Sequence, residues 1–107
     1  KDEDPLSLQG SYTRQQALST GTYQVYLEFT TDGHLIWTPD ESAQGHSPSQ
    51  VSYQLLEGNR FRIYEDNQCE SEAVYSYERS KTTLQLSHIE DDCTPRVNAL
   101  SGIWSVQ

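Results

Sequence analysis

Eight short segments that favour β-strands follow one another along the chain, and they constrain its fold more than any other feature. They lie at about residues 7–15, 21–31, 33–38, 50–57, 59–66, 72–79, 82–89 and 100–106. The second segment alternates most regularly, with Val25, Leu27 and Phe29 on one face and Gln24 and Glu28 on the other. One apolar and one polar face is typical of an antiparallel sheet that covers a core on one side.

Short turns between these segments indicate how the strands are joined. Asp32-Gly33 and Gly58-Asn59 are typical of tight hairpins, and Ser80-Lys81 gives a weaker hairpin signal. Successive hairpins without intervening helices form a meander. We therefore predict an all-β fold, a single up-and-down antiparallel β-barrel of about eight strands. Residues 7–15 and 100–106 would pair to close it, and a flattened sandwich is the alternative.

One other piece of the chain has helical character. Residues 94–99 could form roughly one or two turns, with Thr94 as the cap and Pro95 at the first position. We expect residues 1–6 to be a flexible N-terminal arm and residues 7–107 to form the barrel domain.

Acidic residues outnumber basic ones, with 16 Asp and Glu against 7 Lys and Arg and a net charge of -9. This balance lacks the basic footprint of nucleic-acid binding, so we expect no nucleic-acid partner. No stretch approaches the roughly 18 consecutive apolar residues of a membrane span. Hydrophobic residues make up only 34% of the chain, which favours disorder, but the regular alternation indicates a folded core.

The two cysteines, Cys69 and Cys93, lie at strand edges in polar, acidic stretches. In a meander, the loops before the sixth strand and after the seventh meet at one barrel end, so we expect a Cys69–Cys93 disulfide. A reactive thiol is the alternative, but nearby negative charges disfavour a thiolate and no CxxC motif is present. A disulfide predicts an extracytoplasmic location: secreted, periplasmic or that of a cell-surface lipoprotein.

Two sets of spaced residues carry a family resemblance. The first half has Tyr26-x-x-Phe29-x-x-Asp32-Gly33-x-x-x-Trp37. The second half has Cys69, Tyr75-x-Tyr77, Leu84-x-Leu86 and Asp92-Cys93-x-x-Arg96-x-x-x-Leu100-x-Gly102-x-Trp104. Together these residues resemble the pattern of small lipocalin-like, calycin-type domains of uncharacterised secreted bacterial proteins. The resemblance covers most of residues 8–106.

The resemblance implies a calycin-type barrel, export from the cell and no assigned enzyme activity. It also implies that Gly102 and Trp104 are structural residues of the last strand. Arg96 is expected to be structural as well, because its distance from Trp104 allows a cation-π or capping contact. Lipocalins proper are longer and carry Gly-x-Trp in the first strand, where this chain has Gly10-Ser11-Tyr12. Their ligand cavity therefore does not transfer automatically to this chain.

Seven carboxylates flank the cysteines and should gather at one barrel end. They are Glu65, Asp66, Glu70, Glu72, Glu90, Asp91 and Asp92. We interpret them as a solvated acidic rim rather than a Ca²⁺ site, because no EF-hand spacing is present. The sequence has no Gly-x-Ser-x-Gly motif and no phosphate-binding loop, and His34, His46 and His88 share no metal-ligand spacing. We expect no cofactor, no metal and no enzyme activity.

Aromatic side chains should supply much of the core, since aliphatic residues are few. Those expected to point inward are Tyr23, Phe29, Trp37, Tyr53, Phe61, Tyr75, Tyr77 and Trp104. We expect them to fill most of the barrel and to leave at most a shallow aromatic pocket at one mouth. The alternative is an open pocket with five candidate ligand contacts: Tyr23, Trp37, Tyr53, Tyr75 and Tyr77.

These observations predict a non-enzymatic, exported or envelope-anchored domain that binds a small, partly apolar ligand. The alternative is a structural or protein-interaction module with a filled barrel. We expect a monomer, with a membrane tether only through a removed or lipidated N-terminus.

Overall fold

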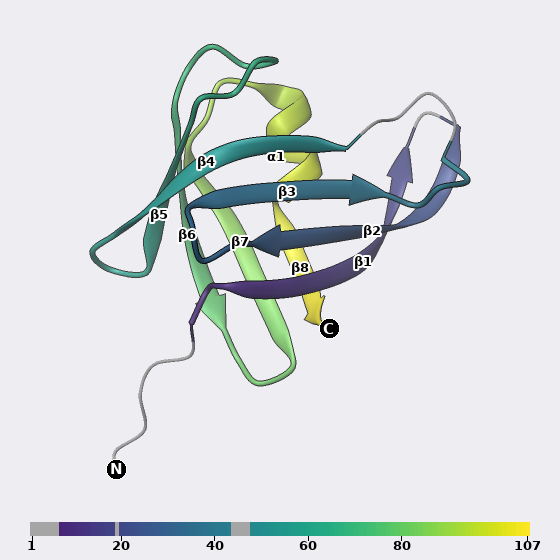
Figure 1. The fold of residues 1–107 in the computed structure, drawn as a ribbon, viewed down its shortest axis with the longest axis horizontal. Helices are drawn as coiled ribbons and strands as arrows, with labels where there is room; N and C mark the ends of the chain where they lie inside the picture. Colours follow the sequence, from purple (N-terminus) through teal and green to yellow (C-terminus); the bar gives the residue numbers. More distant parts are fainter. Residues whose placement is uncertain (1–6, 19, 44–47) are drawn as a thin grey trace.

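The computed structural model of the protein describes residues 7–18, 20–43 and 48–107. Eight strands and one helix follow one another in the order that Figure 1 shows. They are β1 (Gly10–Leu18), β2 (Gly21–Phe29), β3 (His34–Pro39), β4 (Ser49–Leu56), β5 (Arg60–Tyr64), β6 (Ala73–Arg79), β7 (Thr83–Glu90), α1 (Thr94–Leu100) and β8 (Gly102–Val106). The expected strands are confirmed, with bounds that differ by a few residues. The expected helix is confirmed as well.

The strands form one closed barrel. Each strand pairs antiparallel with the next, and β1 pairs with β8 to complete the ring. The up-and-down barrel is therefore confirmed, and the sandwich alternative is wrong. The closing contact is short, because only Tyr12 with Val106 and Thr13 with Ser105 are in register between β1 and β8.

Tight turns join the strands where the sequence predicted them. Gly33, between β2 and β3, has a φ of 93°, and Gly58, between β4 and β5, has a φ of 76°. Backbone with positive φ is easily reached by glycine but strained for other residues, which explains glycine at these two turns. In the third turn, the Ser80 hydroxyl accepts hydrogen bonds from the backbone N–H groups of Thr82 and Thr83.

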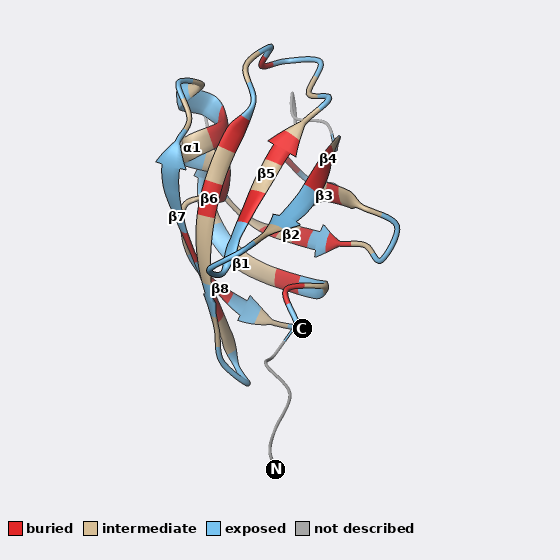
Figure 2. Cartoon of the chain, turned by 90° about the vertical axis from the view of Figure 1, so that its left-hand side faces the viewer, coloured by how far each residue is buried: buried red, intermediate tan, exposed pale blue. Residues whose placement is uncertain are grey.

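The core is built largely from aromatic side chains. Phe29 makes edge-to-face contacts with Tyr12, Tyr53 and Phe61, and Phe61 stacks on Tyr75 with ring centroids 5.7 Å apart. Figure 2 shows the corresponding alternation of buried and less buried residues along β5 and β6. These rings compensate for the small number of aliphatic residues, because each aromatic side chain buries a large apolar area.

The two ends of the barrel differ. Eight strands that alternate in direction bring the start of β1 and the end of β8 to one end, away from α1 (Figure 1). At that end the buried residue Leu8 covers the core, and its carbonyl accepts a hydrogen bond of 2.6 Å from the Tyr12 hydroxyl. Arg79 donates to the same hydroxyl at 3.0 Å. The opposite end holds α1 and the longer connections, and we call it the helix end.

One detail of the predicted helix is wrong. The residue that precedes the first helical turn is Cys93 rather than Thr94, and its side chain makes no capping hydrogen bond. Pro95 does lie in the first turn, where its missing N–H leaves no intrahelical bond unmade. The predicted arm over residues 1–6 and the loop residue His46 lie outside the described residues.

Candidate ligand-binding site

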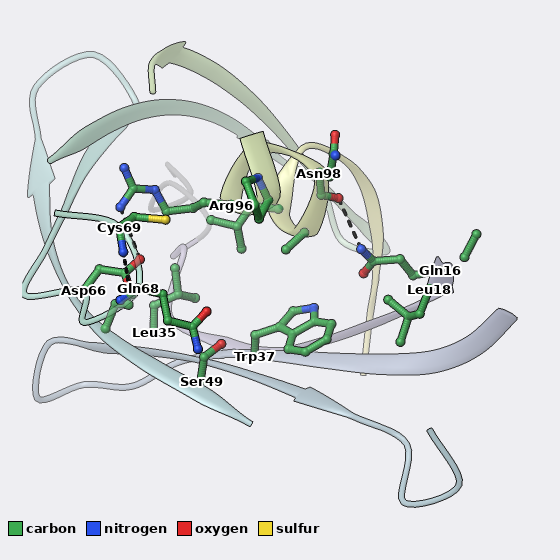
Figure 3. A pocket seen from close by; sticks show the side chains of 15 residues that line it. Gln16, Leu18, Leu35, Trp37, Ser49, Asp66, Gln68, Cys69, Arg96 and Asn98 are labelled. Carbon is green, nitrogen blue, oxygen red and sulfur yellow. Dashed lines mark hydrogen bonds and ion pairs between the residues drawn. The ribbon is translucent and has the colours of Figure 1, made fainter. Parts of the chain in front are cut away.

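A pocket of about 490 Å³ opens at the helix end of the barrel. Its walls come from five parts of the chain. They are the end of β1 with Gln16, the inner faces of β3 with Trp37 and of β4 with Val51, the loop before β6 with Cys69, and α1 with Ala99. Figure 3 shows the indole of Trp37 lying between the strands and the helix. The pocket therefore lies at the helix end, between the strands of the barrel and α1.

The helix is attached to β1 by side chains that follow the two residue pairs joining β1 to β8. Arg14 donates to the carbonyls of Ser101 and Ala99, each at 2.7 Å, and Gln16 Nε2 donates to the carbonyl of Asn98 at 3.2 Å. The last turn of α1 has no basic residue of its own. Arg14 supplies the positive charge and the hydrogen bonds that the free carbonyls of a helix end require.

Arg14, and not Arg96, makes the cation-π contact with Trp104. Its guanidinium lies 4.1 Å from the centre of the indole ring. The predicted contact between Arg96 and Trp104 is therefore wrong. The reason is that Arg96 points toward two carboxylates, whereas Trp104 is fully buried and its indole N–H donates to the Leu100 carbonyl at 3.0 Å.

Gly102, at the start of β8, is a structural residue because it lies against the guanidinium of Arg14. Its φ is 119°, and a side-chain Cβ there would lie only 2.8 Å from Arg14 Nη1. Any larger residue would both strain the backbone and displace the arginine that caps α1.

Arg96 forms the buried charge cluster of the helix end. Its guanidinium makes two hydrogen bonds to Asp91, at 2.9 and 2.8 Å, and one to Asp66 at 3.2 Å. A further N–H donates to the Ser71 carbonyl at 2.9 Å. The Arg96 side chain is 5% exposed, and those of Asp91 and Asp66 are 0% and 11% exposed. These bonds hold α1, the loop before β6 and the segment after β7 together.

This cluster corrects one expectation about the acidic residues. The seven carboxylates do not all form a solvated rim, because Asp91 and Asp66 turn inward to the arginine. Burial alone would raise the pKa of Asp91, but hydrogen bonds from Arg96, Tyr75 and the Cys93 N–H outweigh it and lower that pKa. The hydrogen bond to Asp91 in turn raises the pKa of Arg96. Both groups are therefore charged around neutral pH.

The Cys69–Cys93 disulfide is confirmed. It joins the loop before β6 to the residue that precedes α1, with Cα atoms 6.0 Å apart. Asp66 accepts a hydrogen bond from the backbone N–H of Cys69, and Asp91 accepts one from that of Cys93. The disulfide and the charge cluster therefore fix the same two walls of the pocket. Disulfides form in oxidising compartments.

We expect the double substitution Cys69→Ser with Cys93→Ser to lower the free energy of unfolding by about 3–4 kcal/mol. This is the chain-entropy value for a loop of this length, the two cysteines being 24 residues apart. Urea unfolding of the variant and the oxidised protein would measure it. Reduction of the unmodified protein should reproduce the loss, and equal stability in all three samples would contradict a structural disulfide.

The predicted aromatic contacts need correction. Of the five candidates only Trp37 lines the pocket. Tyr53 and Tyr75 lie in the core, and Tyr77 packs against it. Tyr23 is half-buried and donates its hydroxyl hydrogen to the Thr20 carbonyl at 3.1 Å. Tyr53, Tyr75 and Tyr77 lie in or against the core, whereas the pocket occupies only the helix end. Tyr23 lies on the same face of the sheet as Gln16, its partner across the strand pair, but does not line the pocket.

Two polar atoms of the pocket residues have no hydrogen-bond partner among the described residues. They are the indole nitrogen of Trp37 and the side-chain oxygen of Gln16, and both are buried. Sequence reasoning missed Gln16, because an exposed and an inward-facing glutamine look alike in an alternating strand. The only sequence feature that indicates an inward orientation of Gln16 is its position on the same strand face as Tyr12 and Arg14.

Three core tyrosines make the protein sensitive to high pH. Burial raises the pKa of Tyr75, and its 2.6 Å hydrogen bond to Asp91 raises it further. Burial also raises the pKa of Tyr12 and Tyr53. The unfolded chain ionises these groups near pH ~10, whereas the folded chain keeps them neutral, so this stabilisation is present below about pH 10 and lost above it.

We therefore expect the free energy of unfolding to fall between about pH 9 and about pH 11. Urea unfolding at several pH values would measure the fall, and tyrosinate absorbance would report ionisation. Tyr75→Phe should show a smaller fall than the unmodified protein. A free energy of unfolding that stays constant over this range would contradict the burial of ionisable tyrosines.

The described residues show no arrangement for metal chemistry, since no three His, Cys, Asp or Glu side chains among them are placed to hold a metal ion. Over the same residues, no helix has the length and apolar character needed to cross a membrane. The sequence matches no family model and no curated protein. The lipocalin-like resemblance therefore stays a prediction.

Proposed function

We propose that this protein is a non-enzymatic, exported lipocalin-like domain that binds a small, partly apolar molecule at the helix end of its barrel. The observation that carries the proposal is the pocket of about 490 Å³. Ligand pockets in proteins commonly measure about 300–1,000 Å³ and combine apolar walls with a few polar groups.

The composition of the walls supports this proposal. Leu18, Leu35, Val51 and Leu100 supply apolar surface, and Trp37 adds one aromatic ring. The polar atoms without partners, on Trp37 and Gln16, are of the kind that orient a ligand. The helix and the disulfide stiffen two walls, which reduces the entropy lost on binding.

The proposal includes an extracytoplasmic location, as a secreted, periplasmic or lipid-anchored protein. The disulfide supports it, because such bonds persist where thiols are not kept reduced. We further propose that the domain acts as a monomer.

A structural or protein-interaction module with a filled barrel is the second candidate. The packing of Tyr12, Phe29, Tyr53, Phe61 and Tyr75 favours it, because these rings fill the barrel below the pocket. Under this candidate the pocket at the helix end would bind nothing.

A dye-binding experiment separates the two candidates. The probe is N-phenylnaphthylamine, a neutral apolar dye whose fluorescence rises in apolar surroundings. Val51→Phe places a ring into the pocket, since Val51 is half-buried and lines it. We expect saturable dye binding to the unmodified protein and affinity weaker by roughly tenfold or more in this variant, about 1.4 kcal/mol.

The matched control is Val74→Phe. Val74 lies between buried Ala73 and Tyr75 on β6, so its side chain faces the outside of the barrel. This variant should bind the dye like the unmodified protein. Absence of saturable binding, or equal binding by both variants, would reject the pocket and favour the filled module.

A further inference from the structure

The pocket offers no free positive charge to a ligand. Arg96 is the only basic residue among the described residues that line it. Its guanidinium is already paired with Asp91 at 2.8 Å and Asp66 at 3.2 Å, so one positive charge faces two negative ones. The chain as a whole carries a net charge of -9. A carboxylate or phosphate ligand would therefore be repelled rather than attracted.

Among the polar side chains that line the pocket, which include Ser49, Gln68 and Asn98, two have a buried atom without a hydrogen-bond partner among the described residues, one a donor and one an acceptor. The indole nitrogen of Trp37 can only donate. The orientation of the Gln16 amide is fixed by its bond to the Asn98 carbonyl, because only the NH₂ group can donate to that oxygen. Gln16 Oε1 is therefore the acceptor, and neither atom has a partner among the described residues. Figure 3 shows the Gln16 amide and the Trp37 indole pointing toward each other.

We infer that this pocket selects uncharged alcohols, molecules with a hydroxyl head and an apolar body. The inference rests on the proposed function. A hydroxyl is the smallest group that both accepts, from the Trp37 N–H, and donates, to Gln16 Oε1. The apolar body would then lie against Leu35, Val51 and Leu100. A buried donor or acceptor left unpaired is costly, so a ligand that satisfies both atoms is favoured over one that satisfies only one.

Three small molecules of nearly equal size test the inference. Octanol can donate and accept, its isomer heptyl methyl ether can only accept, and octanoate is an anion. Each competes with N-phenylnaphthylamine for the unmodified protein. We expect octanol to bind about threefold to tenfold more tightly than the ether, which corresponds to one net hydrogen bond. Octanoate should bind least tightly.

Two substitutions assign this preference to particular atoms. Gln16→Met keeps the length of the side chain and removes the acceptor, so it should abolish the preference for octanol over the ether. Trp37→Phe removes the donor and should weaken octanol and the ether alike, by about threefold to tenfold. Val74→Phe is the control that should change neither affinity. Circular dichroism and melting curves verify that each variant is folded.

The outcomes separate this inference from the proposed function. If the dye and all three compounds fail to bind, the proposed function is wrong and the inference falls with it. If all three bind equally, or if octanoate binds best, the pocket is real and the alcohol inference is overturned. A preference that survives Gln16→Met overturns it too. Should that variant not fold, Trp37→Phe decides, and an unchanged octanol affinity overturns the inference.

Discussion

Substitution of Arg96 by methionine should lower the free energy of unfolding by about 3–5 kcal/mol, the usual cost of removing one partner from a buried ion pair. The variant leaves Asp91 fully buried and Asp66 mostly buried, with no guanidinium between them. It also leaves the Ser71 carbonyl without its donor. Because these bonds join α1 to the loop before β6, the pocket should loosen as well, and dye affinity should fall.

The matched control is Arg62→Met. Arg62 pairs with Glu72 at 2.8 Å, but both side chains are substantially exposed. Exposed ion pairs contribute at most about 1 kcal/mol, so this variant should unfold close to the unmodified protein. Urea unfolding of the three proteins gives the comparison. If the two variants lose the same small amount, the Arg96 cluster does not hold the helix end together.

Truncation of Tyr75 to alanine should cost about 3–5 kcal/mol, the range for large aromatic-to-alanine changes in a core. Tyr75 is fully buried, stacks on Phe61 and does not line the pocket. Dye binding should therefore change little as long as the variant is folded. An open barrel would give the opposite result, with stability unchanged and dye binding altered.

Tyr75→Phe separates the hydroxyl from the ring. This variant keeps the packing and removes the 2.6 Å hydrogen bond to Asp91. Hydrogen bonds to charged groups contribute about 1.5–3 kcal/mol, so the loss should be smaller than for alanine. Thermal and urea unfolding of the two variants would measure the difference. Equal losses would show that the hydroxyl, rather than the ring, carries the effect.

The strands and turns were predictable because they depend on local rules. Val25, Leu27 and Phe29 are buried as their alternation indicated, and the glycines of Asp32-Gly33 and Gly58-Asn59 adopt positive φ at hairpin turns. A meander also brings the segments around the two cysteines to one end, so the disulfide followed from topology. Each of these features depends only on residues close together in the sequence or on the order of successive hairpins.

The contacts of the arginines could not be predicted in the same way. Arg14 meets Ala99 and Ser101 across the ring closure, more than 80 residues along the chain. Arg96 meets Asp66 and Asp91 from different connections, and an inward-turned aspartate has the same sequence signal as an exposed one. A long charged side chain can reach many partners, and which of them it contacts depends on how the whole helix end packs.

The inward-facing residues of β1 could not be predicted from the sequence pattern either. Tyr12 is not among the aromatic residues that the sequence predicts to face inward. It is fully buried, and its hydroxyl accepts from Arg79 and donates to the Leu8 carbonyl. The alternation of residues 10–18 is masked by polar side chains such as Arg14 and Gln16, which face inward to hold α1. Polar side chains that face inward to hold a helix therefore weaken the alternation that would identify a core strand.

The outer ends of the first and last strands lie at the end of the barrel opposite the pocket. The start of β1 and the end of β8 lie at one end of the barrel, and the pocket opens at the other. Any polypeptide or lipid joined before Leu8 or after Gln107 would therefore attach at the face remote from the pocket. A domain held to a surface by its C-terminal end would therefore direct the opening of the pocket away from that surface, and an affinity tag joined after Gln107 would leave the opening uncovered.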